Sequence, residues 1–192
     1  MKNKGFTLVE LLAMLTVIAI IMVVAIPNIN GMLKNQRLNQ IKIDATSMVE
    51  AAKMKASKNP SLAKIKSGEC IVFSLNYLDD NENIVKGPNG GYYDLYDSIV
   101  VYTREDTSQS KKYKYYVRLV EKSRGKRVGI GLVESNNIDS LTTSDVREIE
   151  DNIGITKETT KEDSLELISG FGTISSVCEL NPTIKDYYSG DE

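Results

Sequence analysis

The chain of 192 residues contains no histidine and only two cysteines. Without histidine it lacks the commonest general base, the commonest metal ligand and the usual serine or cysteine triads. The two cysteines, Cys70 and Cys178, are too few for a zinc site of thiolate ligands. No glycine-rich loop has the lysine or the helix context of a phosphate-binding site. We therefore expect no catalytic residues, no metal, no cofactor and no enzymatic activity, although paired carboxylates alone can hydrolyse glycosides.

Neither sign of charge dominates the chain. It has 24 basic and 26 acidic residues, a net charge of −2, and charged residues make up 26% of the sequence. A direct nucleic-acid site requires a basic face, and the balanced charge of the chain indicates no such site. The length fits one globular domain with an appendage.

A long apolar segment near the start of the chain carries a single charge. Between Lys4 and Lys34 the only charged residue is Glu10, and residues 11–26 are apolar except for one threonine. With its apolar flanks the segment reaches the roughly 20 residues that a membrane-spanning helix needs. Pro27 lies near its far end, where a proline would kink or end the helix.

Two general interpretations of this segment are open. Lys2 and Lys4 with a small-residue site after Ala25 would make it a secretory signal peptide, and the mature chain would begin at Ile26. A plain membrane anchor is the second, but it leaves Glu10 unexplained, because a carboxylate in hydrocarbon is expensive and usually marks a function. Basic residues flank both ends of the segment, so charge does not define its orientation.

The sequence KGFTLVELL at residues 4–12 resembles the processing motif of type IV prepilins and type II secretion pseudopilins. That motif is a short basic leader ending in glycine, then phenylalanine, then Thr-Leu-hydrophobic-Glu and an apolar run. Gly5, Phe6 and Glu10 take the marked positions here. Pro27 also falls where many family members carry a proline, and the resemblance covers about the first 30 residues.

The resemblance implies that a prepilin peptidase cuts between Gly5 and Phe6, removes the leader 1–5 and leaves an N-methylated Phe6. It also implies that Glu10 pairs with the new amine of a neighbouring subunit during assembly. Such pairing has a physical reason, because a buried carboxylate without a partner costs several kcal/mol. The alternative role for Glu10 is a position at the level of the lipid headgroups.

Beyond the apolar segment the pattern becomes amphipathic. Apolar residues at spacings of three and four, from Leu38 to Ala56, predict a helix that runs to about Lys58. From Phe6 this is one helix of 53 residues, about 80 Å long. We expect residues 6–33 to form a transmembrane and filament-core half and residues 34–58 to pack on the globular domain.

Residues 59–192 are expected to form that globular head domain. Alternating apolar residues predict strands in CIVFSLNYL, SIVVYT, KYKYYVRLVE and RVGIGLVE, at residues 70–78, 98–103, 112–121 and 127–134. The last run should place Val128, Ile130 and Leu132 on one face. Together they predict an antiparallel meander with one face on the helix.

The region after the meander carries weaker signals. A helix is expected from a cap at Thr143 or Ser144 to Gly154, residues 161–170 fit either a helix or a strand, and residues 172–180 fit a final strand. The predicted fold class is therefore α+β, with a short helix and a final strand in the C-terminal region, and the resemblance to prepilins implies that this is the type IV pilin fold.

Two features of the head invite a functional interpretation. The acidic loop 78–91 begins like an EF-hand but lacks its glycine and its closing glutamate, so a solvated turn is favoured over a calcium site. The resemblance to a family whose C-terminal segments are often tied down implies a disulfide between Cys70 and Cys178. Two buried reduced thiols are the alternative.

We expect a structural subunit of an extracellular type IV pilus or pilus-like filament, and its length after the meander favours a minor pilin. Its partners would be other pilin subunits, a prepilin peptidase and the assembly machinery. It would cross the inner or cytoplasmic membrane once before assembly and then lie on the cell surface. Motility, adhesion, secretion and DNA uptake remain open as uses. The alternative is a secreted or membrane-tethered binding domain with an ordinary signal peptide.

Overall fold

The computed structural model describes residues 7–60, 65–79 and 86–181, without the side chains of 24–28 and of residue 161. The chain divides into two compact units, Met1–Arg37 and Leu38–Glu192. One helix, α1, runs from Leu8 to Lys58 and so contributes to both units.

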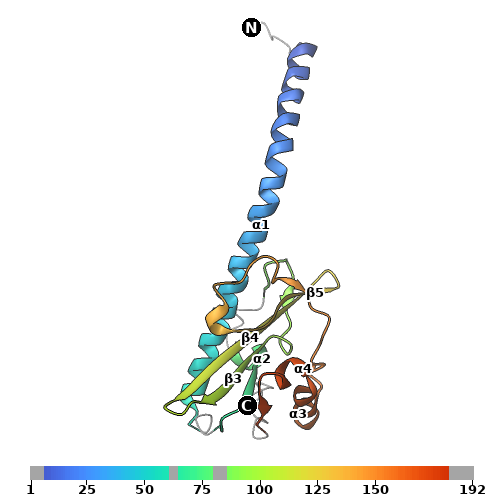
Figure 1. Cartoon of the computed structure of the whole chain (residues 1–192). Helices are drawn as coiled ribbons and strands as arrows, with labels where there is room; N and C mark the ends of the chain where they lie inside the picture. Colours follow the sequence, from blue (N-terminus) through green and yellow to red (C-terminus); the bar gives the residue numbers. More distant parts are fainter. Residues whose placement is uncertain (1–6, 61–64, 80–85, 182–192) are drawn as a thin grey trace. The chain divides into compact units, whose positions relative to one another are not determined.

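The second unit is built on a sheet (Figure 1). Its elements are β1 Glu69–Ser74, α2 Leu75–Leu78, β2 Tyr92–Tyr93, β3 Ile99–Asp106, β4 Lys111–Ser123, β5 Lys126–Glu134, the 3-10 turn η2 Ser135–Asn137, β6 Arg147–Glu148, α3 Lys161–Gly170, α4 Gly172–Ser175 and β7 Glu179–Leu180. The strand order is β6-β5-β4-β3-β1-β7, and β2 also pairs with β4. The pairs are antiparallel except for β1 with β7. The predicted α+β class, with a long N-terminal helix before an antiparallel sheet, is confirmed.

Both faces of this sheet are covered. Alternate residues of β1 enter two different clusters: Ile71 and Phe73 pack with the α1 residues from Leu38 to Ala52, whereas Val72 packs with α3 and α4. The second cluster takes its C-terminal members from residues 153–178. The face expected to lie on the helix does so, and the C-terminal segment buries the opposite face.

A β-bulge in β5 changes which residues face each cluster. Leu119 pairs with Ile130 and Val117 with Val133, so two residues of β5 oppose one of β4. Ile130 lies in the cluster under α1, but Leu132 packs against the other one. The expectation that Ile130 and Leu132 share a face was therefore wrong, because the extra residue reverses the alternation.

The helix expected from Thr143 or Ser144 to Gly154 is absent from the described residues. This segment instead contains β6, whose Arg147 pairs with Gly129 of β5. The Ile149 N–H donates to the Arg127 carbonyl at 2.8 Å. Partners distant in sequence thus satisfy backbone groups that a helix would have paired internally.

The expected final strand is shorter than its pattern suggested, because residues 172–175 form α4 and only β7 is extended. The short β7 is held on β1 by several bonds. Cys70 and Cys178 form a disulfide with their Cα atoms 5.6 Å apart. The Glu179 N–H donates to the Gly68 carbonyl at 2.8 Å, and the Asn181 N–H donates to the Cys70 carbonyl at 2.9 Å. These contacts join the C-terminal segment to the first strand.

A buried carboxyl group lies between α1 and the sheet. Asp44 is 8% exposed and accepts hydrogen bonds from the Tyr93 hydroxyl and the Gln40 amide, both at 2.8 Å. Burial raises the pKa of Asp44, the two hydrogen bonds oppose that shift, and the charge of Glu121 adds to it.

Stability of the second unit should therefore respond to pH through Asp44. A carboxyl whose pKa is raised on folding contributes its full stability below about pH 4 and loses it as the pH rises through the folded-state pKa. Between pH 4 and pH 7 we expect Asp44→Asn to gain stability relative to the wild type. Urea unfolding of the full chain in detergent measures this. Asp139→Asn, at an exposed aspartate, is the control, and identical pH profiles for Asp44→Asn and wild type would contradict the prediction.

The disulfide should contribute strongly to stability, because it joins residues 108 positions apart. Replacing both cysteines by serine is expected to lower the free energy of unfolding by about 2–5 kcal/mol. Reductant should destabilise the wild type by a similar amount and leave the double variant unchanged. A loss below about 1 kcal/mol in the double variant would show that the hydrogen bonds of β7 suffice.

Candidate functional site

The described part of the N-terminal unit, from Thr7 onward, begins with a helix cap. The Thr7 N–H and hydroxyl donate to Glu10 Oε2 at 3.0 and 2.9 Å, and the Glu10 N–H donates to Thr7 Oγ1 at 3.3 Å. This reciprocal arrangement is a capping box, with Thr7 before the helix and Glu10 at its third residue. It satisfies two backbone donors that the first turn of α1 would otherwise leave without a partner.

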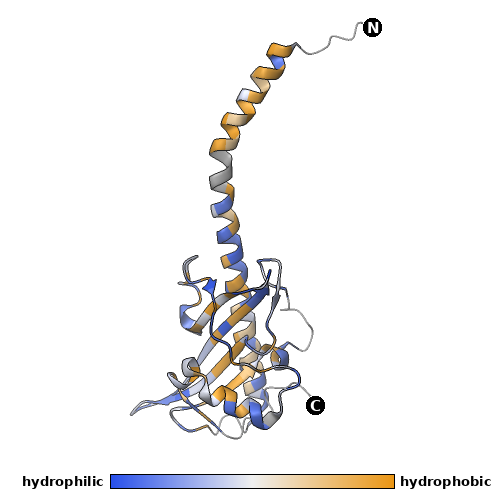
Figure 2. Cartoon of the chain, turned by 90° about the vertical axis from the view of Figure 1, so that its right-hand side faces the viewer, coloured by the Kyte–Doolittle hydropathy of each residue, from blue (hydrophilic) through white to orange (hydrophobic). Residues whose placement is uncertain are grey.

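Hydrophobic residues make up most of the first half of α1 (Figure 2). Fifteen large apolar residues from Leu8 to Leu33 are each at least 43% exposed. They are Leu8, Val9, Leu11, Leu12, Met14, Leu15, Val17, Ile18, Ile20, Ile21, Met22, Val23, Ile29, Met32 and Leu33. A soluble domain rarely exposes so large an apolar patch, and such a surface marks a site of interaction. Among the residues that the structure describes, no helix reaches the length and apolarity needed to cross a membrane.

The other residues expected in this site lie as follows. Gly5 and Phe6, the expected cleavage and methylation positions, fall outside the described residues. Position 27 lies within α1, so Pro27 does not end the helix, and its kink stays a prediction. The structure brings Glu10 together with Thr7, while Cys70 and Cys178 belong to the second unit.

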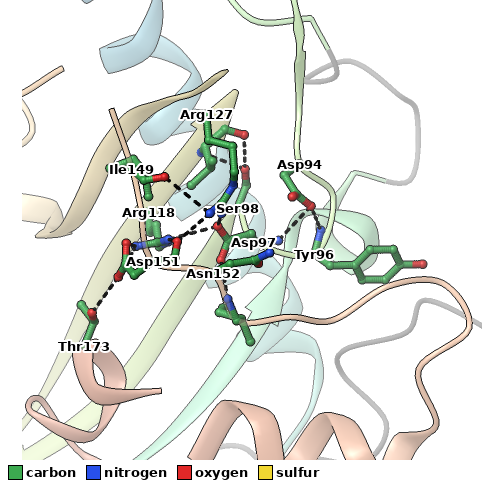
Figure 3. Close-up of polar contacts among 12 residues, drawn as sticks. Asp94, Tyr96, Asp97, Ser98, Arg118, Arg127, Ile149, Asp151, Asn152 and Thr173 are labelled. Carbon is green, nitrogen blue, oxygen red and sulfur yellow. Dashed lines mark hydrogen bonds and ion pairs between the residues drawn. The ribbon is translucent and has the colours of Figure 1, made fainter. Parts of the chain in front are cut away.

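The second unit contains a buried charge cluster (Figure 3). Arg118 is 1% exposed and donates to Asp97 at 3.0 Å and to the Asp151 carboxylate at 3.2 Å. Arg127 also contacts Asp97, and its guanidinium donates to the Asp151 carbonyl at 2.7 Å. Burial raises the pKa of Asp97, and the guanidinium groups of Arg118 and Arg127 lower it.

This cluster has a structural role. The Ile153 N–H also donates to Asp97 at 3.3 Å, and the Arg118 guanidinium donates to the Asp151 carbonyl at 2.8 Å. The cluster therefore fastens the segment after β6 to β4 and β5. Removing Asp97 would leave Arg127 without a carboxylate partner among the described residues and the buried Arg118 with only the half-exposed Asp151, which is destabilising.

The described half of the acidic loop binds a carboxylate of the chain itself. Buried Glu121 accepts bonds from the Asn89 N–H at 3.0 Å and the Gly91 N–H at 2.7 Å. A side chain at Gly87 would collide with Glu121, since an added Cβ would lie 2.2 Å from its carboxyl carbon. Residues 80–85 lie outside the described part. Within that part, no three cysteine, aspartate or glutamate side chains are grouped to hold a metal ion.

A cavity of about 390 Å³ beside β5 and β6 contains hydroxyl and charged groups, including Ser144, Thr173 and Arg147. The Ser144 hydroxyl is 2.7 Å from the hydroxyl of Thr142, which is too weak a base to activate it. The Thr173 hydroxyl donates to the Asp151 carboxylate at 3.2 Å, and that carboxylate is also ion-paired with Arg118.

Sequence reasoning placed Thr7 in the processing motif but missed its role as the helix cap. Its signal was present, because Thr-x-x-Glu directly before an apolar run is the pattern of a capping box. The residues of the charge cluster had no comparable local pattern, since Asp97, Arg118 and Asp151 are far apart in the chain.

Comparison with protein families matches residues 1–26 to the prokaryotic N-terminal methylation motif. Comparisons with curated proteins and with solved structures found no match. The matched segment contains Gly5 and Phe6, the Thr7–Glu10 cap and most of the exposed apolar surface. The chain thus carries the N-terminal methylation motif, which is the hallmark of type IV pilins and pseudopilins.

Proposed function

We propose that the chain is a structural, non-catalytic subunit of an extracellular type IV pilus or pilus-like filament. A prepilin peptidase removes residues 1–5, and the new amine of Phe6 is methylated. The subunit waits in the inner or cytoplasmic membrane as a single-pass protein. The assembly machinery then packs its N-terminal helix among those of other subunits at the cell surface.

The observation that carries this proposal is the methylation motif at the start of a helix with an exposed apolar surface. Fully burying one large apolar side chain contributes about 1.5–3 kcal/mol. Fifteen such residues therefore favour a lipid or helical environment over water by a wide margin. A membrane followed by a filament core supplies both environments in turn.

Glu10 has a specific part in this proposal. In the filament core its carboxylate pairs with the Phe6 amine of a neighbouring subunit, which removes most of the cost of burying both charges. A subunit docked one turn out of place leaves both charges without a partner, so the pair defines the axial register.

The alternative function is a secreted or membrane-tethered binding domain released by ordinary signal peptidase. The 360 Å³ cavity beside Cys178 and the 390 Å³ cavity beside β5 would then be its candidate binding sites. The two functions predict different mature ends, Phe6 and Ile26.

Mass spectrometry of the native protein tests this difference. We expect a mature chain that begins with N-methylated Phe6 and is recovered in filaments sheared from the cells. Gly5→Leu should block cleavage by the peptidase and leave residues 1–5 attached to unassembled chain in the membrane. A mature end at Ile26, with no filament at the cell surface, would exclude the proposed function.

Comparison of Glu10→Gln with Thr7→Ala separates the two roles of Glu10. Glutamine preserves the capping box but has no charge for the amine, whereas Thr7→Ala removes the threonine hydroxyl and keeps the charge. We expect Glu10→Gln to lower the yield of sheared filaments at least about tenfold, since an unpaired buried charge costs several kcal/mol. Thr7→Ala, which weakens only a cap worth about 1 kcal/mol, should retain most of the yield. Equal losses in both variants would assign Glu10 to capping alone.

A further inference from the structure

Charge is unevenly distributed within the second unit. Residues 104–127, which include β4 and both of its hairpin turns, contain nine basic and three acidic residues. Residues 139–180, which include α3 and α4, contain ten acidic and three basic residues. Most of these basic residues are ion-paired within the chain, so only the exposed cations that remain without a carboxylate can attract an unlike surface of another molecule.

The β4–β5 turn presents an exposed cation at its tip. Ser123 pairs with Lys126, so Arg124 and Gly125 alone form the turn, with φ values of 51° and 77°. Positive φ at both positions is the geometry that Asn-Gly prefers, and it is unfavourable for arginine. The neighbouring Lys122 and Lys126 are ion-paired with Asp94 and Glu148. Arg124 is exposed and makes no ion pair with any described residue.

A groove of about 640 Å³ beside α3 has the complementary character. Phe171 and the 39%-exposed Leu167 give it an apolar floor, while Asp163 and Glu166 supply carboxylates. Asp163 is already engaged with the Thr160 hydroxyl at 2.6 Å. Glu166 is exposed and has no cationic partner in the described part of the chain.

Arginine suits such a groove better than lysine does. Its aliphatic stem can lie on an apolar floor while its guanidinium donates two parallel bonds to a carboxylate. Because Arg124 sits on a two-residue turn between paired strands, little backbone freedom is lost when it docks.

The two surfaces lie at opposite ends of the second unit. In Figure 1 the β4–β5 turn is near the top of the sheet and α3 is near its base. They therefore cannot meet within one molecule, but one copy can offer its turn to the groove of the next. Contacts between two different surfaces produce open chains of subunits unless the rotation closes a ring.

We propose that Arg124 of one copy docks in the α3 groove of the next copy, against Glu166 and over Leu167. This contact rests on the proposed filament function and deepens it, because it gives the head domains a directional interface of their own. It also accounts for an arginine at a turn position where asparagine would be less strained.

Substitutions at Arg124 and Glu166 test the contact in the full chain expressed in its source cells. Arg124→Glu and Glu166→Arg should each lower the yield of sheared filaments by about two- to fivefold, the range expected for an exposed ion pair. Combining the two reversals should restore most of the yield. Failure of the combination to recover would overturn the proposal.

Arg124→Asn is the matched control for folding. Asparagine tolerates positive φ, so the melting temperature of the full chain in detergent should rise by about 1–3 °C while filament yield falls. A normal filament yield in this variant would contradict docking by Arg124.

Cysteines at positions 124 and 167 give a readout independent of yield. Their combination should produce a ladder of covalent oligomers on non-reducing gels, because each link joins different positions of two copies. Cysteine at one position alone should give no ladder. A cross-link confined to another polypeptide would overturn the choice of a second copy as the partner.

Comparison of filaments from wild-type cells and from the variants distinguishes failure of this proposal from failure of the function on which it rests. Filaments that contain the chain but resist every substitution at Arg124 and Glu166 would overturn the docking contact alone. Absence of the chain from all sheared filaments would overturn both.

Discussion

The constraint on which the molecule depends is the apolar surface of its N-terminal helix. Fifteen large apolar side chains are exposed there, and their contact with water is unfavourable. At about 1.5 kcal/mol for each side chain, their burial is worth on the order of 20 kcal/mol. One unpaired carboxylate costs only several kcal/mol. Burial therefore wins even if Glu10 finds no partner, so the carboxylate does not decide whether the helix leaves water.

What Glu10 can decide is the axial position at which the helix docks on its neighbours. An apolar surface without polar groups attracts another such surface in almost any register, because the hydrophobic effect is not directional. A charge that must meet an opposite charge is directional. The capping box adds to this, because its bonds with Thr7 hold the Glu10 carboxylate at the first turn of α1 before any partner arrives. In the proposed filament, exchange of that local cap for an amine of a neighbour changes little in the helix itself.

Local patterns predicted the parts of the fold whose partners are local. Spacings of three and four predicted α1 to Lys58, where it ends, and period-two alternation predicted β3, β4 and β5. The same reasoning failed for residues 143–154, because that backbone is bound by β5 and by side chains of the buried charge cluster. It failed at Leu132 because a bulge of one residue reverses the faces of a strand. Within the candidate site, the cleavage motif and Glu10 were evident from short-range sequence, as the helix cap at Thr7 also should have been.

The second unit shows the same division between non-directional burial and directional polar contacts. Two apolar clusters cover the faces of its sheet. The position of the C-terminal segment, however, depends on the Arg118–Asp97 ion pair and on the disulfide, which both require a specific geometry. The strained turn at Arg124 fits this division, because it holds a charge at an exposed position where no apolar burial can stabilise a contact. If apolar helices supply most of the cohesion of a filament, its helical symmetry must come from such polar contacts. In the proposed filament, polar contacts of the head would act together with the Glu10–amine pair of the N-terminal unit, so the head can change its contacts while the N-terminal motif is kept.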